Sequence, residues 1–302
     1  MTKPRVLVSN IMMLNEKPRF DAALRQRGYD PVWPDVAQFM DEAQCLELVG
    51  EVDGWLAGDD RITRAVLQAA LPRLKVIAKW GTGTDSIDRT AADDLGVPVL
   101  NSPGAFADAV AEVAIGMILM LSRHLRVIDH EIRAGKWPKP QGVELRGSTL
   151  GMIGYGAIGR RIAELGRAFG MEVIFHDPFV EGSRTPQDVA ETADILCLAC
   201  AQTEENYHFV NAALLARMKP TALVVNVARG PLVDETALIA ALQEGRIAGA
   251  GLDVFEHEPL PAANALLAME NVVLSSHNAN NGIRAVEAVH ANTLKNLDRV
   301  LG

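Results

Sequence analysis

A glycine-rich turn between a short apolar run and a helical pattern constrains the fold of this chain more than any other feature. The turn reads Gly154-Tyr155-Gly156-Ala157-Ile158-Gly159, follows the apolar residues 150–153 and precedes the helical residues 160–169. The first glycine permits a tight turn, the second lets a ligand approach the backbone, and the third lets helix and strand pack closely. The sequence therefore predicts a parallel α/β sheet with an anion site at the helix N-terminus.

An acidic residue completes this pattern. Asp177 ends the next predicted strand, 18 residues after Gly159. A carboxylate at this place accepts hydrogen bonds from ribose hydroxyls, and its charge repels a 2′-phosphate. The sequence therefore predicts a dinucleotide site that prefers NAD to NADP. The alternative interpretation is a glycine-rich strand-to-helix connection that binds no ligand.

Short apolar runs alternate with helical patterns along the whole chain, which predicts parallel sheets covered by helices on both faces. In the first third, the predicted strands are residues 5–10, 31–33, 52–57, 74–80 and 98–100. The helices predicted between them are residues 20–27, 37–49 and 87–95, each closed by a glycine. Later in the chain we predict six strands, as a full dinucleotide-binding sheet requires, at residues 149–154, 172–177, 194–200, 222–228, 250–255 and 271–277.

Two further helical segments organise the chain. Residues 107–134 form one long predicted helix, and the following Trp137-Pro138-Lys139-Pro140 prevents it from continuing. We take this helix as the boundary between two domains. The last helix, residues 284–301, carries apolar residues at helical spacing and is predicted to pack back onto the first domain.

Composition and charge exclude several classes of protein. The 302 residues are enough for two domains, and 29 Lys and Arg against 38 Asp and Glu give a net charge of −9, which repels nucleic acids and anionic membranes. The longest apolar run, residues 113–121, is much shorter than the roughly 20 residues that cross a bilayer. The N-terminus predicts a first strand and no signal peptide.

The three cysteines indicate a reducing compartment and argue against a metal or redox site. Cys45, Cys197 and Cys200 are an odd number and cannot form a closed disulfide framework, which indicates a reducing compartment and favours the cytoplasm. Cys197 and Cys200 are three residues apart on a predicted strand, where their side chains point to opposite faces. We therefore predict no metal or redox site there.

Charged side chains follow three predicted strands, at the edge where a doubly wound sheet binds its ligands. Arg229 can bind a carboxylate and polarise the adjacent carbonyl, and His277 can donate a proton to the carbonyl oxygen as hydride reaches the carbon. Glu258 beside His277 would favour the imidazolium. Each side chain alone is more often a surface or structural residue, but together they predict hydride transfer to a 2-keto acid.

Longer motifs carry a resemblance to a known family. Besides the nucleotide loop, they are residues 79–88, 101–104, 110–112, 226–230 and 253–259. Through them the sequence resembles the D-isomer-specific 2-hydroxyacid dehydrogenases, and especially the phosphoglycerate-dehydrogenase-like branch, over nearly the whole chain. The resemblance implies two doubly wound parallel-sheet domains, in which a Rossmann NAD-binding domain, residues 102–282, is inserted into a flavodoxin-like substrate-binding domain, residues 1–101 plus 283–302.

The resemblance also implies site residues and an assembly. It implies the catalytic set Arg229, Glu258 and His277, with no metal. The NAD contacts that we expect are Thr82, Gly154, Gly156, Ala157, Ile158, Gly159, Asp177, Cys200, Val227, Ala228, Arg229, Asp253 and His277. Substrate contacts are expected from Thr82, Gly83, Arg229 and His277, with backbone amides around Thr82 and Gly83 binding the substrate carboxylate. A homodimer is expected to form around residues 107–147.

Three segments depart from the family pattern. Ala201 stands where many relatives have proline, and residues 278–281 replace a run of small residues and glycine. The acidic segment Gly58-Asp59-Asp60-Arg61 stands where phosphoglycerate-specific relatives have an arginine-bearing loop. Because two acidic residues repel a phosphate, we expect that 3-phosphoglycerate is not the best substrate, and that glyoxylate or hydroxypyruvate is used instead.

Some alternatives stay open on the sequence alone. The chain resembles D-3-phosphoglycerate dehydrogenase proper, and also non-enzymatic NAD(H)-sensing binding proteins that share the fold and the three charged residues. An enzyme that oxidises phosphite is a further alternative, whereas Glu258 argues against formate. No regulatory domain follows the last helix, so we expect no serine feedback. Trp80 is predicted either to line the substrate pocket or to close a buried strand.

Overall fold

The computed structural model describes residues 3–302, so the first two residues of the predicted substrate-binding domain lie outside it. The chain divides into two compact units. The first unit comprises Met1–Ala105 and Ile283–Gly302, and the second comprises Phe106–Gly282. None of the helices in the described residues is long and apolar enough to cross a membrane.

The first unit is built on a five-stranded parallel sheet in the order β2-β1-β3-β4-β5. Its strands are β1 (Arg5–Val8), β2 (Asp30–Val32), β3 (Gly54–Ala57), β4 (Val76–Lys79) and β5 (Val99–Leu100). This is the strand order of flavodoxin-like folds, which bind ligands beyond the carboxyl ends of the strands. The five predicted strands are confirmed, with shorter bounds for most of them.

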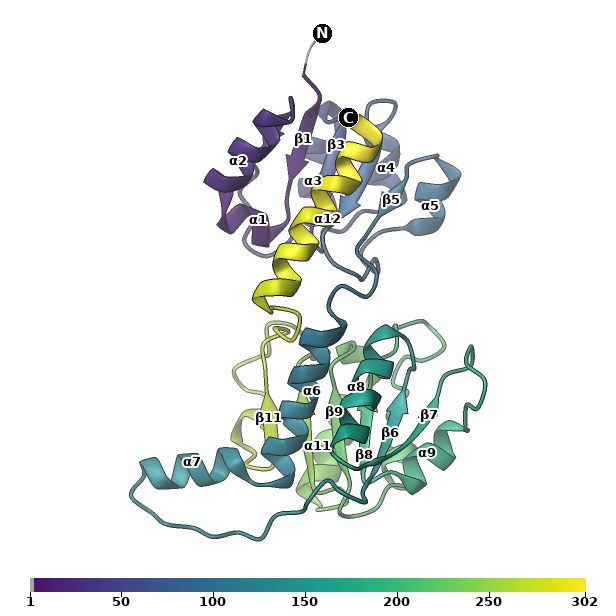
Figure 1. Cartoon of the computed structure of the whole chain (residues 1–302). Coiled ribbons are helices and arrows are strands. Elements are labelled where there is room, and N and C mark those ends of the chain that lie inside the picture. Colours follow the sequence, from purple (N-terminus) through teal and green to yellow (C-terminus); the bar gives the residue numbers. More distant parts are fainter. Residues whose placement is uncertain (1–2) are drawn as a thin grey trace. The chain divides into compact units, whose positions relative to one another are not determined.

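Helices cover both faces of this sheet (Figure 1). One face packs against α3 (Glu42–Leu48), α4 (Arg64–Ala70) and α5 (Arg89–Asp94), with η1 (Val49–Glu51) beside them. The other face carries α1 (Ile11–Asn15), α2 (Lys17–Gln26) and the last helix, α12 (Ile283–Leu301), which lies along β3 and β4. A Cβ on Gly54 would lie 2.7 Å from methyl groups of Leu297 and Leu301, so glycine lets α12 approach β3 closely. The prediction that the last helix packs onto the first domain is confirmed.

Capping decides where α3 begins. The sequence predicted a helix from residue 37, but the structure starts it at Glu42, because Asp41 forms a capping box. The Asp41 carboxylate accepts from the Gln44 N–H at 2.9 Å, and the Gln44 side chain accepts from the Asp41 N–H at 3.0 Å. These two bonds satisfy donors that the first turn leaves free, and they fix the helix start.

The second unit is built on a six-stranded parallel sheet in the order β11-β10-β9-β8-β6-β7. Its strands are β6 (Thr149–Ile153), β7 (Glu172–His176), β8 (Ile195–Leu198), β9 (Leu223–Asn226), β10 (Gly249–Leu252) and β11 (Val272–Leu274). The six predicted strands are confirmed. Since β7 lies on one side of β6 and β8 on the other, the order reverses at β6, and ligands of such sheets bind in the crevice at this point.

Two layers of helices cover the second sheet. One layer is α6 (Ala107–Ser122) and α8 (Ala157–Ala168), and the other is α9 (Pro186–Thr192), α10 (Ala212–Leu215) and α11 (Glu235–Gln243), with the short helices η2 (Gly230–Leu232) and η3 (Ala265–Ala268) in the loops. A Cβ on Gly251 would lie 2.9 Å from the Cβ of Met117, so α6 packs directly on β10.

The predicted single helix over residues 107–134 is wrong. It breaks into α6 and α7 (Leu125–Arg133) at His124, whose φ of 53° is left-handed. The Arg123 and His124 N–H groups turn back to carbonyls of the last turn of α6, an arrangement that ends a helix. None of the described residues of α7 is buried, and an extended segment follows it around the end of the unit (Figure 1).

Candidate active site

The glycine turn between β6 and α8 has the geometry of a ligand-binding loop. Gly154 has a φ of 91°, and a Cβ on it would lie 2.6 Å from the backbone nitrogen of Cys200. A Cβ on Gly159 would lie 2.2 Å from the carbonyl oxygen of Gly154, so packing requires glycine at both places. At Gly156, the N-cap of α8, no described atom beyond its neighbours lies within 4 Å of a built Cβ. The turn is therefore open at Gly156, where α8 begins, and a pyrophosphate bound there could accept from the amides of the first turn of the helix.

Asp177 is fixed beside this turn, directly after β7. One carboxylate oxygen accepts from the Tyr155 N–H at 2.7 Å, and the other accepts from the Phe179 N–H at 3.0 Å. Each oxygen keeps further lone pairs, so the carboxylate can still accept from ribose hydroxyls. The residues present therefore fit a dinucleotide.

The side chain of Asn226 shapes the turn that presents Arg229 after β9. Its oxygen accepts from the Ala228 N–H at 3.0 Å, and its nitrogen donates to the Arg229 carbonyl at 2.9 Å. Arg229 itself donates to the Ala228 carbonyl at 2.8 Å. Val227 and Ala228 are buried in this turn. Asn226 was not among the predicted site residues, although its place at the end of a strand shortly before the predicted Arg229 is a signal that the sequence contains.

Close packing joins this turn to the segment after β10. A Cβ on Gly230 would lie 1.8 Å from the carbonyl oxygen of Phe255, so only glycine fits there. The Arg229 turn is thereby packed against the backbone just before Glu256 and Glu258.

A buried carboxylate holds the turn of His277 after β11. The His277 N–H donates to the Asp253 carbonyl at 2.7 Å, and the Asp253 carboxylate accepts from the N–H groups of Asn278 at 3.0 Å and Ala279 at 3.1 Å. His277 has a φ of 53°, a left-handed conformation that a non-glycine residue keeps only when its surroundings fix it. Asp253, expected as an NAD contact, uses its carboxylate in this structure to hold the backbone of the histidine.

His277 and Glu258 form the central pair of the site. Nδ1 of His277 lies 2.7 Å from Oε2 of Glu258, whose Oε1 accepts from the Phe255 N–H at 3.0 Å. The carboxylate fixes the proton on Nδ1, so Nε2 is the nitrogen available for proton transfer.

The charges around the pair set its protonation. The hydrogen bond to Glu258 raises the pKa of His277 above its usual value, against the opposing effects of burial and of the positive charge of Arg229. Burial pushes the pKa of Glu258 upward, but the hydrogen bonds from His277 and Phe255 outweigh it, and that pKa lies below its usual value. The charge of Arg229 affects both groups, so the three side chains act on one another.

Thr82 and Gly83 lie in the first unit, in the loop that follows β4. The Asn101 side chain donates to the Thr82 carbonyl at 2.6 Å, and the Thr82 hydroxyl donates to the Ser102 carbonyl at 3.0 Å. The Ser102 N–H donates to the Gly81 carbonyl at 2.8 Å. The segment after β5 therefore holds the loop that is expected to bind a carboxylate.

The acidic segment after β3 differs from the expectation. Asp60 is fully buried and accepts from the Ser9 hydroxyl and from the N–H groups of Met40 and Gly58, so it points into the first unit. The Asp59 side chain is 77% exposed and forms an ion pair with buried Lys79 at 3.0 Å. The expected repulsion of a phosphate is therefore weaker than two free acids would give, because Asp60 is buried and Lys79 compensates the charge of Asp59.

The two cysteines of residues 197–200 have different surroundings. Cys197 is buried in β8, and Cys200 follows the strand with its backbone against Gly154. Burial raises the pKa of Cys197 to about 12 and that of Cys200 to about 11. Neither side chain is a thiolate near neutral pH, so Cys200 can serve the site through its backbone and its shape.

A further side-chain contact joins two loops of this site. Nε2 of His208 lies 2.8 Å from Oε1 of Glu256, which also accepts from the Glu235 N–H at 3.0 Å. His208 follows β8 and Glu256 follows β10, so the contact connects two loops at the carboxyl edge of the sheet. His208 was not predicted as a site residue, because no pattern near it in the chain indicates its partner Glu256.

Comparisons with known proteins agree with this geometry. Residues 115–279 match the family described as D-isomer specific 2-hydroxyacid dehydrogenase, NAD binding domain. A glyoxylate reductase of Thermofilum pendens is 39% identical over 259 residues, covering 80% of this chain and 76% of that protein. A D-3-phosphoglycerate dehydrogenase of Methanocaldococcus jannaschii is 35% identical over 285 residues, covering 88% of this chain and 53% of that protein.

A solved structure resembles the whole chain. It is an NADPH-dependent glyoxylate/hydroxypyruvate reductase from Sinorhizobium meliloti in complex with NADP and malonate, with a TM-score of 0.83 and 32% identity, covering 98% of this chain and 92% of that one. The chain therefore belongs to the D-isomer specific 2-hydroxyacid dehydrogenase family, and it is an NAD(P)-dependent oxidoreductase that acts on CH–OH groups.

Proposed function

We propose that this protein reduces a small 2-keto acid to the D-2-hydroxy acid, with His277 as the acid and base. The observation that carries the proposal is the 2.7 Å contact of His277 Nδ1 with Glu258 beside the Arg229 turn. A bound reduced nicotinamide would supply the hydride, from its C4 to C2 of the keto acid. Arg229, Glu258 and His277 supply the rest of the chemistry.

Each side chain has a separate part in the proposed reaction. The guanidinium of Arg229 pairs with the substrate carboxylate and polarises the neighbouring carbonyl. Nε2–H of His277 donates its proton to the carbonyl oxygen as hydride arrives at the carbon, and Glu258 stabilises the imidazolium before transfer. In the oxidative direction the same nitrogen, unprotonated, accepts the hydroxyl proton.

NAD is the cofactor that the site favours. Asp177 sits where a ribose would lie against the glycine turn, and its charge disfavours a 2′-phosphate. We propose that the pyrophosphate of the cofactor lies against the backbone of that turn, where contacts are expected from Gly154, Gly156, Ala157, Ile158 and Gly159. Cys200, Val227, Ala228, Arg229, Asp253 and His277 remain proposed cofactor contacts, as does Thr82 in the first unit.

Glyoxylate and hydroxypyruvate are the substrates that we propose. A glyoxylate reductase and a glyoxylate/hydroxypyruvate reductase are among the relatives. The amides near Thr82 and Gly83 would bind the substrate carboxylate. We assign residues 1–101 plus 283–302 to substrate binding and residues 102–282 to NAD binding. The second candidate is 3-phosphoglycerate, since a phosphoglycerate dehydrogenase is also a relative.

We also propose a homodimer, located in a reducing compartment such as the cytoplasm. Four large apolar side chains stand exposed on α7 and the segment after it: Leu125, Ile132, Trp137 and Val143. Exposed large apolar side chains that gather in one part of the described chain are typical of a surface between subunits. Sedimentation analysis of a Trp137→Ser, Val143→Ser variant tests the dimer, which the proposal expects to weaken.

The proposed reaction is tested by NADH oxidation. Purified protein is assayed near pH 7 with glyoxylate, hydroxypyruvate, pyruvate, 3-phosphohydroxypyruvate and bulkier keto acids, beside His277→Ala. The proposal expects turnover that is fastest with one of the first two acids and that falls by at least about 100-fold in the variant. NADH binding with no turnover of any acid would contradict it and favour an NAD(H)-sensing role.

A further inference from the structure

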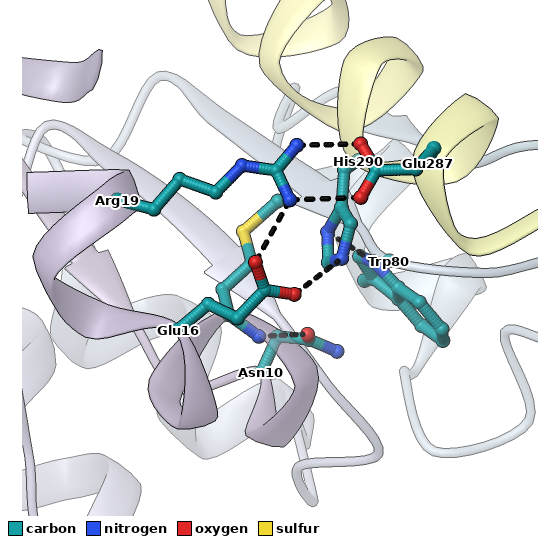
Figure 2. Close-up of polar contacts among 7 residues, drawn as sticks. Asn10, Glu16, Arg19, Trp80, Glu287 and His290 are labelled. Carbon is teal, nitrogen blue, oxygen red and sulfur yellow. Dashed lines mark hydrogen bonds and ion pairs between the residues drawn. The ribbon is translucent and has the colours of Figure 1, made fainter. Parts of the chain in front are cut away.

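A buried histidine of α12 takes no part in the proposed chemistry. His290 is 1% exposed, and its ring centroid lies 4.7 Å from that of Phe20 and 5.7 Å from that of Trp80. Figure 2 shows the imidazole beside the Trp80 indole. Nε1–H of Trp80 donates to Nδ1 of His290 at 3.1 Å. Since Nδ1 accepts this bond, the neutral ring carries its proton on Nε2.

An ionic group surrounds the other nitrogen. Among the residues that the structure describes, Nε2 of His290 has no hydrogen-bond partner, and it faces Oε1 of Glu16 at 3.8 Å. Arg19 joins the carboxylates of Glu16 and Glu287, with 2.8 Å contacts to each (Figure 2). The group resembles a cation site in its spacing, but the guanidinium already pairs with both carboxylates, and Nε2 carries a proton where a metal needs a lone pair.

Trp80 connects this histidine to the expected substrate loop. Its backbone N–H donates to the Ala57 carbonyl at 2.9 Å, and Gly81, with a φ of 104°, turns the chain directly after it toward Thr82 and Gly83. The indole bond to His290 anchors the Trp80 side chain where this turn begins, and Lys79 Nζ donates to the Trp80 carbonyl at 2.8 Å. Trp80 is 7% exposed, which favours the interpretation that it closes a buried strand.

The same helix holds the other side of the loop. The Asn292 side chain donates to the Ser102 hydroxyl at 2.8 Å and to the Asn101 carbonyl at 3.2 Å. Asn101 in turn donates to the Thr82 carbonyl. The middle of α12 thus reaches both flanks of the Gly81–Thr82–Gly83 loop, through His290 on one flank and Asn292 on the other.

We propose that His290, as the neutral imidazole, is a positioning residue that holds the Thr82–Gly83 amides in place for the substrate carboxylate through its bond with Trp80. The proposal rests on the function proposed above for that loop. It adds a residue of the last helix to the determinants of keto-acid binding, although His290 itself touches no substrate.

Protonation of His290 would break this contact. The imidazolium carries N–H on both nitrogens, so Nδ1–H would point at the Trp80 donor. The charged groups that face His290 are Glu16, Glu287 and Arg19. Burial lowers the pKa of His290, the two carboxylates oppose that effect, and Arg19 adds to it. The bond is therefore complete at neutral pH and is lost as the pH falls through this lowered pKa.

Kinetics of three variants test the proposal. His290→Leu removes the Nδ1 acceptor of the bond from the buried Trp80 indole, so we expect KM for the keto acid to rise about tenfold, or about 1.4 kcal/mol, with kcat nearly unchanged. His290→Asn places an amide oxygen near the position of Nδ1 and should restore KM. Tyr29→Phe removes the hydrogen bond that the Tyr29 hydroxyl donates to Asp298, farther along the same helix, and should leave KM unchanged.

The pH dependence separates this role from a merely structural one. In the wild type, KM for the keto acid should rise as the pH falls through the lowered pKa of His290, whereas His290→Asn should lose that rise because its amide does not titrate. Loss of the reactive form of His277 does not cause this rise, because reduction uses the imidazolium and the imidazolium persists in acid. Equal KM values in wild type and His290→Leu, or an acid rise that persists in His290→Asn, would overturn the proposal.

A measurement without substrate distinguishes its failure from failure of the proposed function. In ¹⁵N-labelled protein, the Trp80 indole resonance, identified with Trp80→Phe, should move with pH in the wild type and stay constant in His290→Asn. His290→Leu should shift the backbone amides of Thr82 and Gly83, and Tyr29→Phe should not. If these signals behave as expected but no keto acid is reduced, the proposed function fails while the His290–Trp80 contact stands. If keto acids are reduced but the amides do not respond, the positioning role is wrong.

Discussion

Replacement of Glu258 by glutamine isolates the electrostatic part of the proposed mechanism. The Glu258–His277 hydrogen bond is the largest influence raising the pKa of His277, while burial and Arg229 lower it. Without the carboxylate, burial and Arg229 still lower this pKa and only the charge of Asp253 raises it, so in Glu258→Gln the pKa of His277 should fall from its raised value in the wild type. Reduction needs the imidazolium, so activity is present below this pKa and is lost as the pH rises through it.

The size of the effect follows from the contact. A hydrogen bond to a charged group contributes about 1.5–3 kcal/mol, equivalent to about one to two pKa units. The His277 side chain is 43% exposed, and solvent screening reduces such a pair, so the lower end applies. We therefore expect the alkaline limb of kcat/KM for reduction to lie about one pH unit lower in Glu258→Gln than in the wild type. At a pH above the alkaline limbs of both proteins, the variant should then be about tenfold less active than the wild type.

The assay is NADH oxidation with a saturating cofactor over a range of pH, beside Glu244→Gln, an exposed glutamate of the same unit that pairs with Arg246. The control should keep the wild-type profile. Oxidation of the hydroxy acid, which needs the neutral ring, should suffer much less in Glu258→Gln at alkaline pH. An alkaline limb that stays in place in Glu258→Gln would refute the assignment of the proton donor.

Three further predictions concern single residues. Asp177→Asn should raise the ratio of kcat/KM for NADPH over NADH by about tenfold or more, because it removes a charge that repels the 2′-phosphate; an unchanged ratio in steady-state assays would contradict this role. Arg229→Lys should lower kcat/KM for the keto acid by about 100-fold, since lysine lacks the planar fork that pairs with a carboxylate, and thermal melting should show the fold retained. His124→Val should lower the free energy of unfolding in urea by about 1–2 kcal/mol relative to His124→Gly, because a β-branched residue is strained at a φ of 53°; equal stabilities would argue against the break between α6 and α7.

Much of the fold could be predicted because local signals agree along the chain. Apolar runs of strand length alternate with helical patterns, and the parallel pairing follows from that alternation, as both sheets confirm. The break at His124 could not be predicted, because the apolar pattern continues across it and no glycine or proline marks it. The late start of α3 depends on a capping box, whose residues Asp41 and Gln44 were readable in the sequence but were not weighed.

The candidate site was predictable to the level of residue type. Strand ends located Arg229 and His277, since parallel strands deliver their carboxyl ends to one edge. What the sequence could not supply is the contacts between segments. The roles of Asp253 in holding the His277 turn and of Gly230 against Phe255 depend on packing between loops. The bond between Trp80 and His290 joins residues 210 positions apart, and no local pattern reports it.

The fate of the hydride tests the central claim most directly. The protein is incubated with hydroxypyruvate and NADH deuterated at both C4 positions, and the product is examined by chiral chromatography and mass spectrometry. The account predicts D-glycerate with one deuterium at C2, formed by the wild type and nearly absent with His277→Ala. Product of the L configuration, product without deuterium at C2, or equal formation by His277→Ala would contradict it.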